Sequence, residues 1–159
     1  MSNLPEKIKA TGEVYLQLFN AAGDIVEERK ITNLVVTTGL NHIAGRLSDT
    51  GTPSQMSHMA LGESDLYNAG VTQGVAPADT TLSAQLGSRN GLTVAGGQVA
   101  GSTITYGATF AAGEATGAVV EAGIFNAASA GTMLCRTTFP VINKAPTDSL
   151  AVSWVVTIS

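Results

Sequence analysis

The sequence is poor in charge, in aromatic residues and in cysteine. Charged residues make up 13% of the 159 positions, about half the share of an average globular domain, and aromatic residues make up 5%. The single cysteine, Cys135, excludes a disulfide framework and a zinc site built from several cysteines. The 8 lysines and arginines stand against 12 acidic residues, for a net charge of −4. Because binding to DNA or RNA needs clustered cations, we expect no nucleic-acid partner.

Long hydrophobic runs are also missing. No apolar stretch approaches the roughly 18 residues of a transmembrane helix. The polar start MSNLPEKIKATGE lacks the apolar core of a signal peptide. We therefore expect no membrane partner and synthesis in a cytoplasm.

Small residues take the place of the missing charges. The hydrophobic share of 44% is too high for a disordered chain, and the length predicts one domain. With 18 glycines and abundant threonine, serine and alanine, much of the surface must be small and uncharged. Such a surface suits a protein that packs against copies of itself or against partners, although some stable β-proteins also carry threonine-rich surfaces.

Alternating apolar residues predict strands in the first part of the chain. Residues 13–20 and 25–32 flank a turn at 21–24 and form a hairpin. The charge cluster 27–30 is expected to be a solvated strand face. We expect residues 1–12 to be a polar N-terminal arm, followed by a single β-sandwich domain over 13–159.

A first short helix is predicted over residues 38–47. Thr37 or Thr38 can cap its start. An apolar stripe at helical spacing comprises Leu40, Ile43, Ala44 and Leu47, and a helix of this length can cover one opening of a sandwich or barrel.

A long loop and a second short helix follow. The irregular stretch 62–78 contains Glu63 and Asp65, which could bind a cation weakly but lack the pattern of a calcium loop. Asp79 is a good N-cap for a helix in which Leu82 and Leu86 lie one turn apart. The glycine-rich residues 91–101 are expected to be a flexible connection.

The C-terminal half predicts strands separated by turns. In the last of them, one face carries Leu150, Val152, Trp154, Val156 and Ile158. The inward face of the strand before it is ambiguous, because Met133 and Leu134 are adjacent and both bulky. Roughly seven or eight strands with spacings of about 10–15 residues predict an all-β fold, an antiparallel, jelly-roll-like β-sandwich with one or two short helices.

The residues that could carry chemistry form no catalytic or metal-binding pattern. His42 and His58 lack the spacing of a helical metal pair, and each is expected to be a partly exposed structural histidine. Cys135 lies in an apolar strand, where a thiol behaves as a small hydrophobic residue. Glu114 and Glu121 have only their carboxylates in common with a glycosidase pair. The sequence therefore predicts that the protein is not an enzyme, with no catalytic, cofactor-binding or metal-binding residues and no cofactor.

Five segments resemble small virion proteins of tailed bacteriophages, and together they cover a little over half of the chain. The segment APADTTLSAQL resembles a family pattern AxxDTxLxxEL, with Gln85 where an acidic residue is more usual. The strongest match is TITYGATFAAGEATGAVVEAGIFN at 103–126. The other three are KITNLVVTTGLNHIAGRL at 30–47, SHMALG at 57–62 and TMLCRTTFPVINKAPTDSLAVSWVVTI at 132–158.

The resemblance implies a capsid decoration (cement) protein, although members of this group are also labelled tail-fibre proteins. Such a protein binds the major capsid protein on the capsid exterior of a virion assembled in the host cytoplasm. We expect a homo-oligomer, a dimer or a trimer, that contacts its partner through the loop 62–78 and the arm 1–12.

Two alternatives stay open. The first is a tail-fibre or baseplate component. The second is a carbohydrate-binding module on a similar sandwich, in which Tyr67 is one of the few aromatic residues that could face a sugar.

Overall fold

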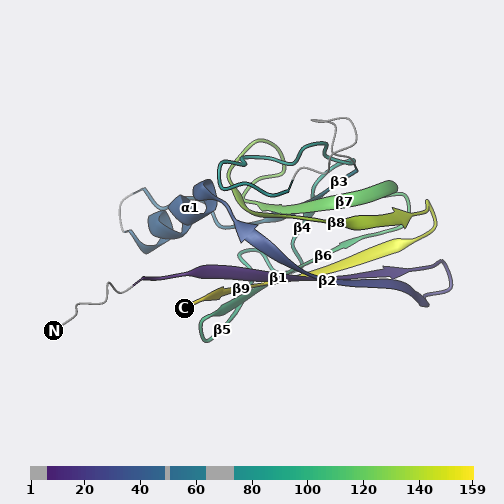
Figure 1. Cartoon of the computed structure of the whole chain (residues 1–159), viewed down its shortest axis with the longest axis horizontal. Coiled ribbons are helices and arrows are strands. Elements are labelled where there is room, and N and C mark those ends of the chain that lie inside the picture. The colour runs from purple at the N-terminus through teal and green to yellow at the C-terminus, as the bar shows by residue number, and fades with distance from the viewer. Residues whose placement is uncertain (1–6, 49–50, 64–73) are drawn as a thin grey trace.

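The computed structural model describes residues 7–48, 51–63 and 74–159. In these ranges the chain folds into nine strands and one helix (Figure 1). The elements are β1 (Ala10–Phe19), β2 (Ile25–Val35), α1 (Thr37–Leu47), β3 (His58–Gly62), β4 (Asn90–Gly91), β5 (Gln98–Ala100), β6 (Thr103–Phe110), β7 (Gly117–Phe125), β8 (Met133–Lys144) and β9 (Ser149–Ile158). The helix has 11 residues, and no helix in the described ranges is long and apolar enough to span a membrane.

All the strands belong to one antiparallel sheet, in the order β4-β3-β7-β8-β2-β1-β9-β6-β5. The sheet curls, and β2 is where it turns. Most of β2 pairs with β1, whereas only Leu34 and Val35 pair with β8. The first half of the sheet is β2, β1, β9, β6 and β5, and the second half is β4, β3, β7 and β8 (Figure 1). The predicted all-β, antiparallel character is confirmed.

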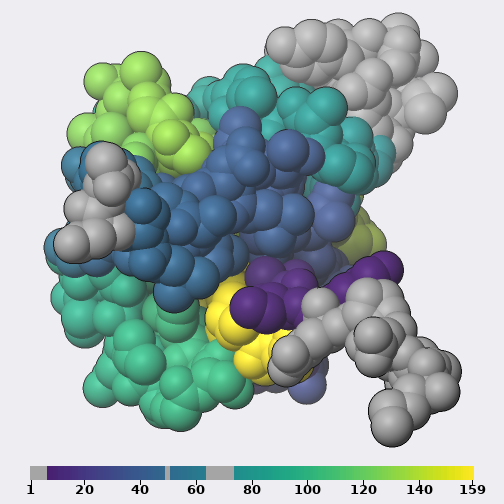
Figure 2. All heavy atoms as spheres, turned by 90° about the vertical axis from the view of Figure 1, so that its left-hand side faces the viewer, coloured from purple at the N-terminus to yellow at the C-terminus, as the bar shows by residue number. Residues whose placement is uncertain are grey.

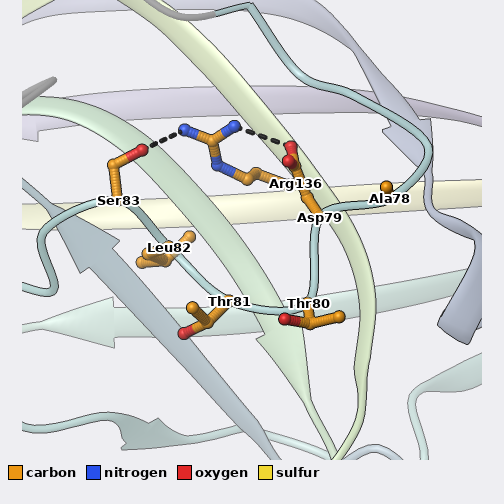
Figure 3. A pocket seen from close by; sticks show the side chains of 7 residues that line it. All are labelled: Ala78, Asp79, Thr80, Thr81, Leu82, Ser83 and Arg136. Carbon is orange, nitrogen blue, oxygen red and sulfur yellow. Dashed lines mark hydrogen bonds and ion pairs between the residues drawn. The ribbon is translucent and has the colours of Figure 1, made fainter. Parts of the chain in front are cut away.

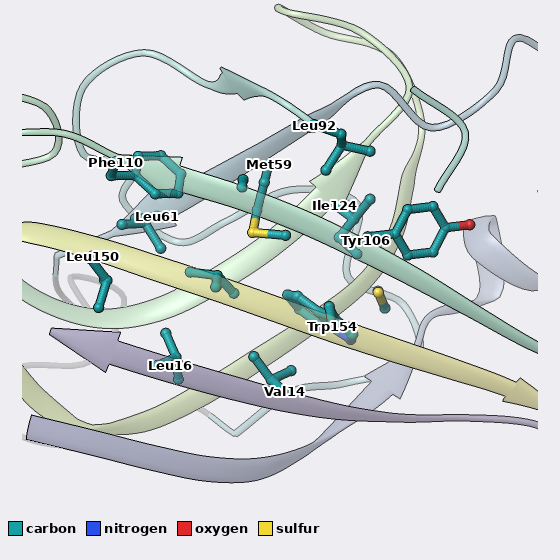
Figure 4. Packing of buried hydrophobic residues seen from close by; sticks show 14 of the residues in the cluster. Val14, Leu16, Met59, Leu61, Leu92, Tyr106, Phe110, Ile124, Leu150 and Trp154 are labelled. Carbon is teal, nitrogen blue, oxygen red and sulfur yellow. The ribbon is translucent and has the colours of Figure 1, made fainter. Parts of the chain in front are cut away.

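The main core fills the space between the two halves (Figure 4). On β9 the predicted alternation is confirmed, because Leu150, Val152, Trp154 and Val156 are at most 3% exposed. Figure 4 shows Leu150 and Trp154 among side chains from β1, β3 and β6. Period-two alternation on strands from both halves therefore produces one shared core.

The helix forms where it was predicted, but only part of its apolar stripe faces the core: Ile43 packs against the main core. Leu40 and Leu47 of the apolar stripe are 49% and 78% exposed, while Gly39 and His42 are buried. A Cβ on Gly39 would lie 1.9 Å from the carbonyl oxygen of Leu134, so the helix approaches β8 through its glycine face. The expected threonine cap is wrong: the N-cap is Val36, without a side-chain hydrogen bond, because Thr38 instead donates to the carbonyl of Met133.

The helix predicted from Asp79 onward does not form. Residues 76–86 run irregularly over the outer face of the second half. The N–H groups of Ser83 and Ala84 bind the carboxylate of Glu121, so they are not available to a helix. Beneath this segment lies a second small core of Val36, Ala60, Leu82, Phe125 and Met133.

This second core resolves the ambiguity at Met133 and Leu134. Met133 belongs to the second core, and Leu134 belongs to the main one. Both faces of β8 are buried here, so two adjacent bulky residues are tolerated.

The glycine-rich stretch 91–101 is not the flexible connection that was expected. It contains the end of β4 and all of β5. Gly97 has φ +76°, and a Cβ there would lie 2.6 Å from Ile104 Cγ2. Glycine at this position therefore serves a tight turn against β6.

Candidate interaction surface

A buried ion pair lies on the outer face of the second half of the sheet. Arg136 on β8 and Glu121 on β7 have side chains that are 4% and 1% exposed. Arg136 donates to Glu121 Oε2 from Nε at 2.9 Å and from Nη2 at 2.7 Å. Burial alone would lower the pKa of the guanidinium, but the hydrogen bonds and charges of Glu121 and Asp79 outweigh it and raise that pKa.

The pair holds the irregular segment 74–89 against the sheet. Glu121 accepts the backbone N–H groups of Ser83 at 3.1 Å and Ala84 at 2.9 Å. Arg136 donates to Asp79 Oδ2 and to Ser83 Oγ, each at 2.8 Å (Figure 3). We call Asp79, Ser83, Glu121 and Arg136 the polar clamp.

A pocket of about 210 Å³ opens beside the polar clamp, lined by residues 78–83 and Arg136 (Figure 3). Arg136 is the cation at its wall, and all three of its nitrogens already donate to protein acceptors. These nitrogens carry five N–H groups, and four of them donate to Glu121, Asp79 and Ser83, so little of the guanidinium remains to bind an anion. The arrangement therefore favours a structural role over ligand binding.

The polar clamp fixes both ends of the predicted contact loop 62–78. At the N-terminal end of the loop, Glu63 N–H donates to the carbonyl of Ala84 at 3.0 Å. At the C-terminal end of the loop, Ala76 N–H donates to Asp79 Oδ2 at 2.8 Å. Gly62 lies so close to Glu121 that a Cβ would be 2.3 Å from Oε1. The loop therefore starts and ends at well-anchored backbone, while residues 64–73 lie outside the described ranges.

The predicted N-terminal arm contributes its last residues to the sheet. β1 begins at Ala10, and Lys9 exchanges two backbone hydrogen bonds with Ser159, at 2.6 and 2.9 Å. Ile8 is 74% exposed. Residues 1–6 lie outside the part of the chain that the structure describes.

The two histidines and the cysteine lie in separate places. His42 is only 8% exposed, and burial, with a smaller contribution from the charge of Arg46, lowers its pKa. This corrects the expectation of a partly exposed histidine. His58 contacts Ser57 Oγ through Nδ1 at 2.8 Å. Cys135 is fully buried in the main core, and burial raises the pKa of its thiol.

The carboxylates considered from the sequence are not brought together either. Glu114 accepts hydrogen bonds from Asn90 Nδ2 and the Ala111 N–H in an exposed turn, whereas Glu121 belongs to the polar clamp. Asp65 and Tyr67 lie outside the described residues. Within those residues, no three His, Cys, Asp or Glu side chains lie where they could hold a metal ion.

The charge cluster on β2 divides between two faces. Glu28 and Lys30 pair with Gln17 and Tyr15 on the outer face, as a solvated strand face requires. Glu27 and Arg29 point inward, opposite Leu18 and Leu16, and form an ion pair whose side chains are 27% and 30% exposed.

The polar clamp was not predicted from the sequence, although two of its residues stand out there. Glu121 and Arg136 are single charges inside the otherwise uncharged and mostly apolar runs VVEAGIF and MLCRTTF. A charge placed in a buried strand requires a partner of opposite sign.

No protein-family model matches this chain, and comparisons with curated proteins and with solved structures each found no match.

Proposed function

We propose that this chain is a structural protein of a tailed-bacteriophage virion, and specifically a decoration protein that binds the major capsid protein and stabilises the head. The observation that carries the proposal is the likeness of five segments to such proteins. These segments supply α1, strands β6 to β9 and all four residues of the polar clamp. A jelly-roll-like sandwich that acts as a homo-oligomer is part of the same proposal.

The polar clamp supports a binding role for the loop 62–78. Anchored loop ends reduce the entropy that a contact loop loses on binding. The outer face of the first half supports lateral contacts, because its side chains on β9 and β6 are small: Ala151, Ser153, Val155, Thr157, Thr103, Thr105, Gly107 and Thr109. Many modest interfaces repeated over a shell then stabilise it by avidity.

Antibody-gold labelling of intact virions tests the proposed location. Even labelling of the head supports a decoration protein. Label confined to the tail contradicts it and identifies a tail component instead. Particles that carry no label until they are disrupted contradict an exterior position.

Heat stability of the heads tests the proposed stabilisation. Capsids assembled without the protein should release DNA at a lower temperature than complete ones. Adding back purified protein should restore the higher release temperature. Equal release temperatures would contradict a cementing role.

A further inference from the structure

The described residues at the two ends of the domain carry opposite charges. At one end β1 starts and β9 finishes, with Ala10 opposite Ile158, and α1 lies across this end (Figures 1 and 2). We call it the helix end. At the other end Phe19 pairs with Ser149, and three turns meet there: 20–24, 111–116 and 145–148. We call this the hairpin end.

Among the residues that the structure describes, the helix end is cationic and apolar. Its described charged side chains are Lys7, Lys9, Arg46 and Arg89. Arg89 is occupied by the ring of Phe125 and by backbone carbonyls. Arg46 donates to the carbonyl of Pro53 at 3.0 Å. Lys7, Lys9 and Arg46 have no carboxylate partner among the described side chains. Exposed beside them are Ile8 at 74%, Leu40 at 49%, Leu47 at 78%, Val94 at 47% and Val99 at 68%.

The hairpin end is acidic and also apolar. Its turns carry Asp24, Glu114 and Asp148, and the cation nearest to them, Lys144, is only 2% exposed. Lys144 donates to the carbonyls of Ala111 and Asp148, at 2.9 and 2.7 Å, and its charge acts on Glu114 and Asp148 from beneath the turns. The three carboxylates outnumber it, so this end stays acidic.

The tip of the β1–β2 hairpin combines both properties in a preformed shape. Asn20 Oδ1 accepts the N–H groups of Ala22 and Asp24, both at 3.0 Å. Next to the Asp24 carboxylate, Ile25 and Val26 are 50% and 54% exposed. A turn held in this way loses little entropy when it binds.

We propose that copies of this chain associate head to tail, with the hairpin tip of one copy bound to the α1 surface of the next. Asp24 then faces the cations Lys9 and Arg46, and Ile25 and Val26 cover Leu40 and Leu47. The second copy is the occupant that the two ends specify, because each end supplies the opposite charge and an apolar patch for the other.

Such an interface uses different surfaces on the two copies. It is therefore heterologous and closes only as a ring of three or more copies, or continues as a filament. The inference concerns purified copies in solution and does not depend on the proposed place in a virion.

Charge-reversal variants of the full chain test the proposal by analytical ultracentrifugation. At low salt, the wild type should sediment as a trimer or a larger assembly, and high salt should dissociate it. Arg46→Glu alone and Asp24→Arg alone should each weaken association by roughly tenfold or more, since each places like charges together. An equimolar mixture of the two variants should assemble again, and so should a chain that carries both substitutions.

Lys30→Glu makes the same charge change on the middle of the sheet and should leave assembly unchanged. Circular dichroism and melting temperatures show whether each variant is folded. A wild type that stays monomeric, single variants that assemble normally, or a mixture of the two that stays dissociated would each overturn the proposal. So would a Lys30→Glu chain that dissociates as much as Arg46→Glu.

Discussion

Arg136 donates two hydrogen bonds to the same carboxylate oxygen of Glu121, and both residues are at least 97% buried, with exposed fractions of 3% and 1%. The other oxygen of Glu121 accepts Ala84 N–H. The pair therefore joins two strands to the irregular segment that covers them. In the folded protein both charges are therefore stabilised mainly by protein groups, not by solvent.

The first prediction concerns the loss of one member of this pair. Glu121→Leu alone or Arg136→Met alone should lower the free energy of unfolding by about 3–5 kcal/mol. Arg136→Met leaves the buried Glu121 carboxylate without a cation, whereas Glu121→Leu leaves Arg136 with Asp79 as its carboxylate and removes the acceptor of the Ser83 and Ala84 N–H groups. The double variant should lose less than the sum of the two. Urea denaturation of the four proteins measures the coupling. Losses that add in full would mean that the two side chains do not stabilise one another.

The second prediction concerns the close approach of α1 to β8. Gly39→Ala should cost about 1–3 kcal/mol, because the new Cβ meets the Leu134 carbonyl, a backbone atom that cannot move aside cheaply. Gly45→Ala in the same helix is the matched control, since its Cβ would lie 3.1 Å from the side chain of Pro53. There a gain in helix propensity of about 1 kcal/mol offsets a mild crowding. Thermal denaturation should give a clearly lower melting temperature for Gly39→Ala than for Gly45→Ala. Equal losses of stability in the two variants would contradict the close packing of α1 on β8.

The strands could be predicted from the sequence because period-two patterns are local. The inward face of β9 and the hairpin of β1 and β2 follow from alternation and turn residues alone. The orientation of α1 could not be predicted, because two surfaces compete for the core. The stripe containing Leu40 and Leu47 is more apolar, but only the face of Gly39 permits contact with β8. Steric fit between distant segments decides such cases.

The polar clamp could not be predicted in full for a similar reason. Asp79 has the local pattern of an N-cap, and local hydrogen bonding would favour a helix after it. Arg136, far away in the sequence, takes the Asp79 carboxylate, and Glu121 takes the N–H groups that a helix would use. Long-range charge pairing thus overrides a local preference.

The third prediction concerns the protonation of His42. Burial lowers its pKa below the ordinary value of 6.5, and the charge of Arg46 lowers it further. The unfolded chain therefore binds the proton first, so the contribution of His42 to stability is complete above pH 6.5 and is lost as the pH falls through the folded-state pKa. An NMR titration should place the His42 midpoint below 6.5, and Arg46→Gln should move it upward without removing the effect of burial. A midpoint at or above 6.5 in the wild type would contradict the buried position.

The fourth prediction concerns the free edge of β2, where the sheet halves separate. Another strand that paired with this edge would have to bury the inward ion pair of Glu27 and Arg29, and inward charges of this kind protect edge strands from association. The double variant Glu27→Val/Arg29→Val should therefore aggregate during incubation, as followed by light scattering.

The matched control is Glu28→Val/Lys30→Val, which removes the same two charges from the outer face of the same strand. Net charge is unchanged in both double variants, so a difference between them reports the direction in which the charges point. The control should stay dispersed, because its inward pair still has to lose water when an edge contact forms. Equal aggregation of the two variants would show that general strand polarity, and not the inward pair, protects this edge.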